Sequence, residues 1–211
     1  MDRNEILEYF ERKGEAIEEM SLKEQIETIL RWTDRKGIDK LLKFMDKAGF
    51  YSAPASGKYH GAYEGALAEH SMNVYNLAID LASVWLGEEW LYHNESSIAI
   101  AAFLHDLGKV GQFGKPLYVE NILKTGQSRT QPFKHNEDLI TLDHEIVSVI
   151  EASKFIELTE EEQFAIAYHN GLYTNIGRYG LQGKERPLQM IIHFADLWAS
   201  RVVEQKGVNN E

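Results

Sequence analysis

The chain of 211 residues contains no cysteine, which excludes both a disulfide framework and a metal site built on thiolates. It carries 22 basic and 33 acidic residues, and the net charge of −11 argues against the basic surface that long nucleic acid requires. No apolar run approaches the roughly 20 residues of a membrane-spanning helix, and the charged segment 1–5 lacks the apolar core of a signal peptide. We therefore expect a soluble, cytoplasmic protein.

The hydrophobic pattern predicts helices that are interrupted by one long polar insert. A length of 211 residues fits one domain, and a 44% hydrophobic content is enough to form its core. The helical segments are expected at 3–32 (one or two helices), 38–50, 66–85, 96–106, 141–155, 160–169 and 187–203. Three signals predict helix starts: the N-cap chemistry of Asn94-Glu95-Ser96 before the helix at 96–106, the capping box that begins at Thr159, and Pro187 at a first helical position.

The first 50 residues are expected to form an N-terminal helical cap on a core built from residues 51–205. A dimerisation element is the alternative interpretation of the same segment, and a homo-oligomer would follow from it. Residues 206–211 are expected to be a frayed tail.

The polar insert, residues 109–138, contains glycines and prolines that preclude a long helix. Segments 117–123 and 129–134 flank the sequence Thr-Gly-Gln-Ser at 125–128, which is typical of a short β-hairpin. Segments 51–65 and 170–186 have the composition of loops.

Histidines and aspartates lie on or beside the apolar stripes of several predicted helices, where they would be costly unless paired or bound to a metal. These residues are His70, His105, Asp106, His144, His169 and Asp196. Imidazoles with carboxylates suit Zn, Fe, Mn or Ni rather than soft Cu(I). Except for the adjacent pair His105 and Asp106, successive residues of this set are at least 25 positions apart in the sequence. We therefore predict that the fold assembles the site, for two ions, from several helices.

Three local motifs carry a resemblance to a known family. They are Leu-Ala-Glu-His-Ser at 67–71, Phe-Leu-His-Asp-Leu-Gly-Lys at 103–109, and Phe-Ala-Asp-Leu at 194–197. Over residues 60–203 the chain resembles the HD-domain metal-dependent phosphohydrolases, of the type with six ligands. The resemblance implies an all-α helical bundle, with the hairpin insert between the second and third ligand-bearing helices.

The resemblance also implies roles for the six residues. His70, His105, Asp106 and Asp196 would hold one divalent ion, and Asp106 would bridge to a second ion held by His144 and His169. The alternative for these last two histidines is contact with a substrate phosphate or a helix carbonyl. The metals would be Mn, Fe, Ni, Co or Zn, with Mg possible, and the substrate a nucleotide or similar small phosphorylated molecule.

Candidate residues for catalysis and substrate binding surround this set. Asp106 and Lys109 are the catalytic candidates, because a lysine three residues from the bridging carboxylate can contact phosphate or orient water. Lys109, Lys58, Arg178 and Tyr173 are candidates for substrate binding. His193 is a candidate to support the ligands, and His60 and His135 lie in loops that could border the site. For each of them, an exposed or merely structural side chain is the alternative.

Three functions remain open from the sequence. The first is hydrolysis of a phosphate ester or anhydride by metal-activated water. The second is a di-iron oxygenase on the same scaffold, and the third is a non-catalytic module that senses a nucleotide. The position of Lys109 favours the first, and we expect neither membrane nor long nucleic acid as a partner.

Overall fold

The computed structural model describes residues 3–59, 61–140 and 142–205. Nine α-helices occur in these ranges: α1 (Arg3–Ile17), α2 (Leu22–Trp32), α3 (Ile38–Ala48), α4 (Ala66–Leu86), α5 (Glu88–Leu104), α6 (His144–Ser153), α7 (Glu160–Ala167), α8 (Asn175–Gly180) and α9 (Pro187–Trp198). Two short 3₁₀ turns, η1 (Leu107–Val110) and η2 (Gly171–Tyr173), and one π-helical turn, η3 (Ala199–Val203), complete the helical elements of the described chain. The fold is all-α, as the sequence predicted.

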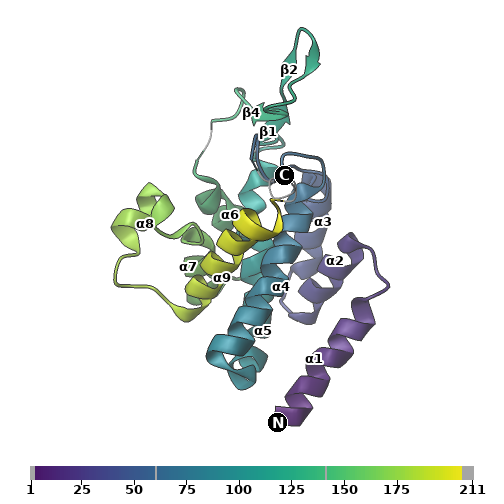
Figure 1. Cartoon of the computed structure of the whole chain (residues 1–211), viewed down its shortest axis with the longest axis vertical. Coiled ribbons are helices and arrows are strands. Elements are labelled where there is room, and N and C mark those ends of the chain that lie inside the picture. Colours follow the sequence, from purple (N-terminus) through teal and green to yellow (C-terminus); the bar gives the residue numbers. More distant parts are fainter. Residues whose placement is uncertain (1–2, 60, 141, 206–211) are drawn as a thin grey trace, which may run out of the picture.

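Helix α4 runs through the middle of the bundle and packs against α5 on one side and α9 on the other (Figure 1). Helix α7 contacts both α5 and α9, while α6 packs against η1 and α7. Apolar side chains from these helices, such as Leu67, Ile98, Phe103 and Ile192, form one buried core. The core holds the ends of α4, α5, α7 and α9 at fixed positions, which is what a site assembled from distant segments requires.

The N-terminal helices α1–α3 are joined to this bundle by the same core and by ion pairs. Ile26, Leu41 and Met45 belong to the core cluster. Arg35 forms two hydrogen bonds, of 3.0 and 2.6 Å, with the carboxylate of Glu162, whose side chain is fully buried in α7. Lys13 of α1 lies 2.8 Å from Glu95 of α5. Residues 3–50 therefore pack on the bundle, and their standing as a separate cap remains a prediction.

The insert between η1 and α6 forms two small antiparallel ribbons. Strand β1 (Tyr118–Glu120) pairs with β4 (Phe133–His135), and β2 (Ile122–Leu123) pairs with β3 (Gly126–Gln127). The β2–β3 ribbon projects away from the helices (Figure 1). The predicted hairpin is therefore present, but its turn falls at Lys124 and Thr125, because Gly126 and Gln127 belong to strand β3.

The helix starts predicted at Thr159 and Pro187 are confirmed, whereas the start predicted at Asn94-Glu95-Ser96 is wrong. Thr159 accepts a hydrogen bond from the Glu162 amide in the expected capping box, and Pro187 begins α9. Helix α5, however, begins at Glu88, not Ser96, because the Asn94 side chain donates to the carbonyl of Trp90 inside the helix rather than capping a new one. The predicted loop 170–186 contains η2 and α8.

None of the helices in the described ranges is both long and apolar enough to cross a membrane. The expected frayed tail, residues 206–211, lies outside the described residues.

Candidate metal centre

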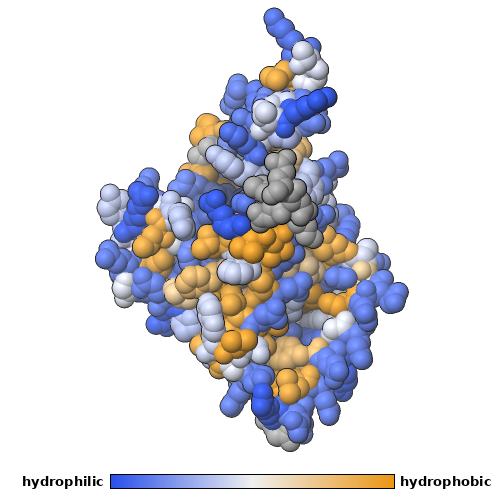
Figure 2. All heavy atoms as spheres, in the orientation of Figure 1, coloured by the Kyte–Doolittle hydropathy of each residue, from blue (hydrophilic) through white to orange (hydrophobic). Residues whose placement is uncertain are grey.

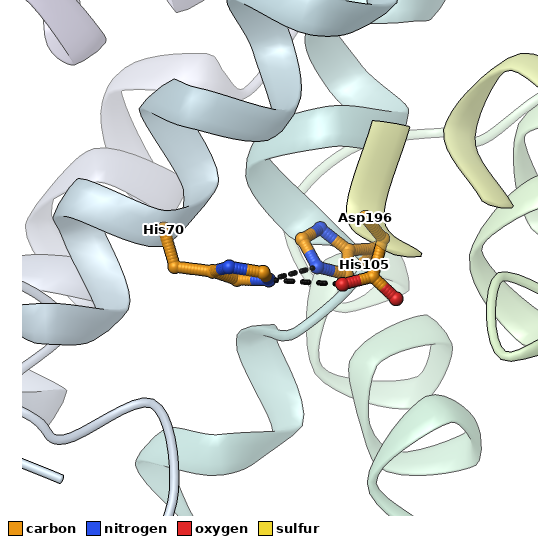
Figure 3. Close-up of side chains that lie close together, drawn as sticks. All are labelled: His70, His105 and Asp196. Carbon is orange, nitrogen blue, oxygen red and sulfur yellow. Dashed lines mark hydrogen bonds and ion pairs between the residues drawn. The ribbon is translucent and has the colours of Figure 1, made fainter. Parts of the chain in front are cut away.

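The bundle brings all six predicted ligand residues to one place. His70 lies in the second turn of α4, and His105 and Asp106 lie at the junction of α5 and η1. His144 is the first residue of α6, His169 follows α7 by two residues, and Asp196 lies in α9. Several of these residues sit at helix ends rather than within helices, so their side chains converge from different directions. Figure 3 shows His70, His105 and Asp196 pointing toward one another from three helical segments.

His70, His105 and Asp196 form one half of the cluster. The Nε2 atom of His70 lies 3.2 Å from Nε2 of His105 and 3.2 Å from Oδ1 of Asp196. Both histidine side chains are almost completely buried. One ligand atom from each of the three residues lies within 4.8 Å of the others, which is close enough to share one ion.

Asp106 connects this half to the second. Its Oδ2 lies 3.4 Å from Nε2 of His105 and 3.5 Å from Nε2 of His70. Its Oδ1 lies 3.1 Å from Nε2 of His144 and 3.6 Å from Nε2 of His169. The two oxygens of one carboxylate thus face two separate pairs of imidazoles, as a bridging ligand would.

The backbone sets the tautomers of two of these histidines. Nδ1 of His105 lies 2.7 Å from the carbonyl oxygen of Ala102, and Nδ1 of His169 lies 2.8 Å from that of Ile166. A carbonyl oxygen only accepts, so Nδ1 carries the hydrogen in both rings. Nε2, which is directed into the cluster, is then the acceptor nitrogen of each ring and can serve as a ligand atom.

This arrangement fits divalent cations. Oδ1 of Asp106 is buried and accepts no hydrogen bond from the described residues, although two imidazole nitrogens face it. Acceptor atoms that face one another in a buried site repel unless a proton or cation lies between them. The donor set is all nitrogen and oxygen, which suits Zn, Fe, Mn, Co or Ni.

The pKa shifts in the cluster reflect burial and the charges that face one another there. Burial opposes ionisation of His70, yet Asp196 and Glu204 raise its pKa to about 10. Burial alone would raise the pKa of Asp106, but the Lys109 ammonium and His105 hold it well below its usual range. Burial and the neighbouring His105 lower the pKa of His169 to about 3, which keeps that imidazole neutral. Without a metal, the proton on His70 supplies part of the missing positive charge.

The glycine of the His-Asp-Leu-Gly-Lys motif has a steric role. A Cβ at Gly108 would lie 2.2 Å from the carbonyl oxygen of His144. Ser148 of α6 donates to the carbonyl of His105 at 2.7 Å and accepts from the Gly108 amide at 2.8 Å. These contacts hold α6 directly against the His-Asp-Leu-Gly-Lys motif and thereby fix the distance between His144 and Asp106.

Lys109 lies against the bridging carboxylate. Its Nζ is 2.5 Å from Oδ2 of Asp106, and although burial opposes the charge, Asp106 raises the pKa of Lys109. Lys109, Tyr173 and His193 line a cavity of about 190 Å³ together with the candidate ligands Asp106, His144, His169 and Asp196. Lys109 and Tyr173 therefore lie beside the candidate ligands, and their roles in catalysis and substrate binding remain predictions.

The other candidates lie apart from this cavity. Lys58 is exposed, with Nζ 5.8 Å from the centre of the Tyr59 ring. Arg178 is exposed in α8 and donates to the carbonyl of Leu172. Neither lines the described cavity, and their substrate contacts remain predictions. His135 lies in β4 and is exposed, and His60 lies outside the described residues.

Three residues at the site were not predicted. Glu204 contacts the outer nitrogen of His70, with Oε1 2.9 Å from Nδ1. Asn170 donates to Nε2 of His169 at 2.8 Å and to Glu145 at 3.1 Å. Arg201 lines the cavity. The adjacency of Asn170 to His169 was a usable signal, whereas Glu204 and Arg201 follow the last motif in a segment whose geometry the sequence does not reveal.

The family model described as HD domain matches residues 67–197, which is more than half of the chain. The protein therefore belongs to the HD-domain superfamily of metal-dependent phosphohydrolases. No curated protein sequence and no solved structure gives a significant match.

Proposed function

We propose that the protein hydrolyses a phosphate ester or anhydride of a nucleotide, or of a similar small phosphorylated molecule, with water activated by two divalent metal ions. One observation carries this proposal. A lysine ammonium lies 2.5 Å from the candidate bridging carboxylate and lines the same cavity as the candidate ligands. A positive charge at that point matches an anionic substrate.

His70, His105, Asp106 and Asp196 would hold one ion, and Asp106, His144 and His169 the other. When bound, such ions lower the pKa of a water molecule and neutralise phosphate charge. The assignment is supported by the geometry of Asp106, each of whose oxygens faces a different pair of imidazoles.

The chain's own residues supply orientation and charge. Lys109 is held by Asp106, so its ammonium is preorganised where a phosphate oxygen would enter the cavity. A preorganised charge of this kind stabilises the charge that develops in the transition state without further reorganisation. Glu145, which is buried, lies 3.3 Å from Nδ1 of His144 and orients that ring.

A hydrolysis assay over nucleoside mono-, di-, tri- and cyclic phosphates tests the proposal, with Mn, Co, Ni, Zn, Fe and Mg supplied in turn. It measures inorganic phosphate, pyrophosphate and triphosphate together with nucleosides, and nucleoside monophosphates from the cyclic substrates. Asp106→Asn should lose both metal and turnover. Lys109→Met should retain the metals but turn over on the order of 100-fold more slowly, whereas Lys124→Met, in the distant β2–β3 turn, should match wild type. Absence of any hydrolysis product with every ion would refute the proposal, and oxygen uptake by the iron-loaded protein would support an oxygenase instead.

A further inference from the structure

An apolar groove adjoins the metal centre. It has a volume of about 810 Å³ and is lined mainly by side chains of α4 and α9, among them Trp85, Phe194 and Trp198. Figure 2 shows the corresponding apolar patch over α4 and α9 in the middle of the face that is turned to the viewer. Volumes between about 300 and 1,000 Å³ are usual for small-molecule sites.

The groove and the metal cavity share walls. Tyr173, Leu197 and Arg201 line both spaces, so the two adjoin each other at these residues. The metal cavity, at about 190 Å³, is much the smaller of the two. A substrate whose phosphate reaches the ligands would therefore extend its organic group along these shared residues into the groove.

Arg201 lies at the junction, where the groove meets the metal cavity. Its side chain is exposed, and within the described chain it forms no ion pair or hydrogen bond. A free guanidinium is well shaped to bind a phosphate in a bidentate manner. This arrangement complements a ligand that has an anionic group at the junction and an apolar group beyond it.

Aromatic rings form much of the surface of the groove. Trp85 and Trp198 are 54% and 56% exposed, although both are large apolar side chains. Trp85 lies edge-on to Phe194, with the ring centres 5.6 Å apart. Few polar groups point into this wall, so an occupant would be held by its flat face rather than by hydrogen bonds to its edge. Stacking of this kind tolerates different bases, because every base has a π-face.

We propose that this groove is a stacking subsite for the heteroaromatic base of a nucleotide, and that it accepts purines and pyrimidines alike. The inference rests on the proposed phosphohydrolase function and adds to it the residues that recognise the base. Trp85 and Trp198 would determine the preference for substrates that carry a base, and Arg201 would hold the phosphate.

Matched substrates separate base recognition from phosphate chemistry. Thymidine 5′-phosphate and 2-deoxyadenosine 5′-phosphate carry the same primary phosphate ester as 2-deoxyribose 5-phosphate but add a base. The p-nitrophenyl diesters of thymidine 5′-phosphate and of methyl phosphate form a second pair with one leaving group. We expect the base to raise kcat/KM by about tenfold or more in the pair that the enzyme hydrolyses, with similar values for the two bases.

Two single substitutions test whether the groove causes the preference for substrates that carry a base. Trp85→Leu and Trp198→Leu should each reduce the preference for the base-bearing substrate toward unity. Val84→Ala, an exposed neighbour of Trp85 outside the groove, should keep the full preference. Thymidine 5′-phosphate should also quench the tryptophan fluorescence of the protein without added metal, and the double variant Trp85→Leu/Trp198→Leu should lose this quenching.

The outcomes distinguish the two levels of the proposal. If no substrate of either pair releases its product with any metal, the phosphohydrolase function itself fails. If both members of a pair are hydrolysed with equal kcat/KM, the function stands and the base subsite is refuted. Faster hydrolysis of dodecyl phosphate than of any nucleotide would also refute it, since the groove would then accept alkyl chains. A dimer that dissociates in the Trp198→Leu variant, with the substrate preference unchanged, would assign the groove to a second copy of the chain and overturn the inference.

Discussion

Glu204 and His70 are joined by a short contact at the outer side of the metal centre. Oε1 of Glu204 lies 2.9 Å from Nδ1 of His70 and accepts a hydrogen bond of 3.0 Å from the side chain of Asn73. The ring nitrogen that faces the cluster, Nε2, is thereby left to point at His105 and Asp196. A carboxylate behind a ligating imidazole fixes the ring and raises its basicity.

The π-helical turn η3 accounts for the position of Glu204. Eight residues separate it from Asp196, and an α-helix would place them about 80° apart around the axis. In η3 the amide of Glu204 instead donates to the carbonyl of Ala199, five residues earlier. The wider turn brings Glu204 back toward the side of the helix that carries Asp196. Such π turns are frequent at functional sites.

Glu204→Ala should weaken the binding of one metal ion by about 10- to 100-fold, because His70 would lose its orienting partner. The second ion, whose candidate ligands exclude His70, should be much less affected. Glu204→Gln, which still accepts a hydrogen bond from Nδ1, should fall between the alanine variant and wild type. Titration of both ions by calorimetry or Co(II) absorption measures this, with the exposed Glu185→Gln as a control. Equal affinities in all variants would contradict the role.

Metal affinity should rise with pH. In the metal-free protein His70 has a pKa of about 10, compared with about 6.5 in an unfolded chain. The protonated ring therefore stabilises the metal-free fold fully below pH 6.5, and this contribution is lost as the pH rises through 10. A metal ion must displace that proton, so affinity should increase by up to about tenfold per pH unit between these values.

Competition titrations with Mn(II) at pH 6.5, 7.5 and 8.5 would measure this slope. Glu204→Gln should flatten it, because one of the carboxylates that raise the pKa of His70 is gone. A wild-type affinity that does not change with pH over this range would show that His70 does not release the proton.

Much of the fold follows from local sequence. The helix at 66–86 is fixed by a long apolar pattern, and the starts at Thr159 and Pro187 by capping chemistry that operates within one turn. The six candidate ligands were recognisable because histidine and aspartate are costly on apolar faces. The structure then brings their side chains together from separate helices.

The parts that the sequence did not predict depend on contacts between distant segments. Helix α5 continues through Glu95 because that carboxylate is held by Lys13 and Tyr9, more than 80 residues away. Glu204 reaches His70 only through a π turn, which has no strong sequence signal. The same turn carries Arg201 to the wall of the cavity.

Arg35→Ala should destabilise the protein strongly. The change leaves the fully buried carboxylate of Glu162 without its cation, although Ser97 still donates to it at 2.8 Å. Breaking a buried pair in this way costs about 3 kcal/mol in the free energy of unfolding. Urea denaturation measures the loss, and Arg12→Ala, an exposed arginine of α1, is the control. A change below about 1 kcal/mol would show that the pair is effectively solvated.

Gly108→Ala should separate α6 from the His-Asp motif. The added Cβ would lie 2.2 Å from the carbonyl oxygen of His144, a distance that only a backbone shift relieves. Because His144 begins α6 and faces Asp106, that shift should weaken the ion assigned to Asp106, His144 and His169. The ion assigned to His70, His105, Asp106 and Asp196 should be affected less, since α4 and α9 are not displaced.

The matched control is Gly14→Ala. Gly14 lies inside α1 with no atom within 4 Å of an added Cβ, so alanine should stabilise the helix, by about 1 kcal/mol at most. Metal stoichiometry and thermal unfolding of both variants provide the test. We expect Gly108→Ala to bind one ion per chain with a lowered Tm, and Gly14→Ala to bind two with an unchanged or higher Tm. Two tightly bound ions in Gly108→Ala would show that the contact between α6 and the motif does not set the second site.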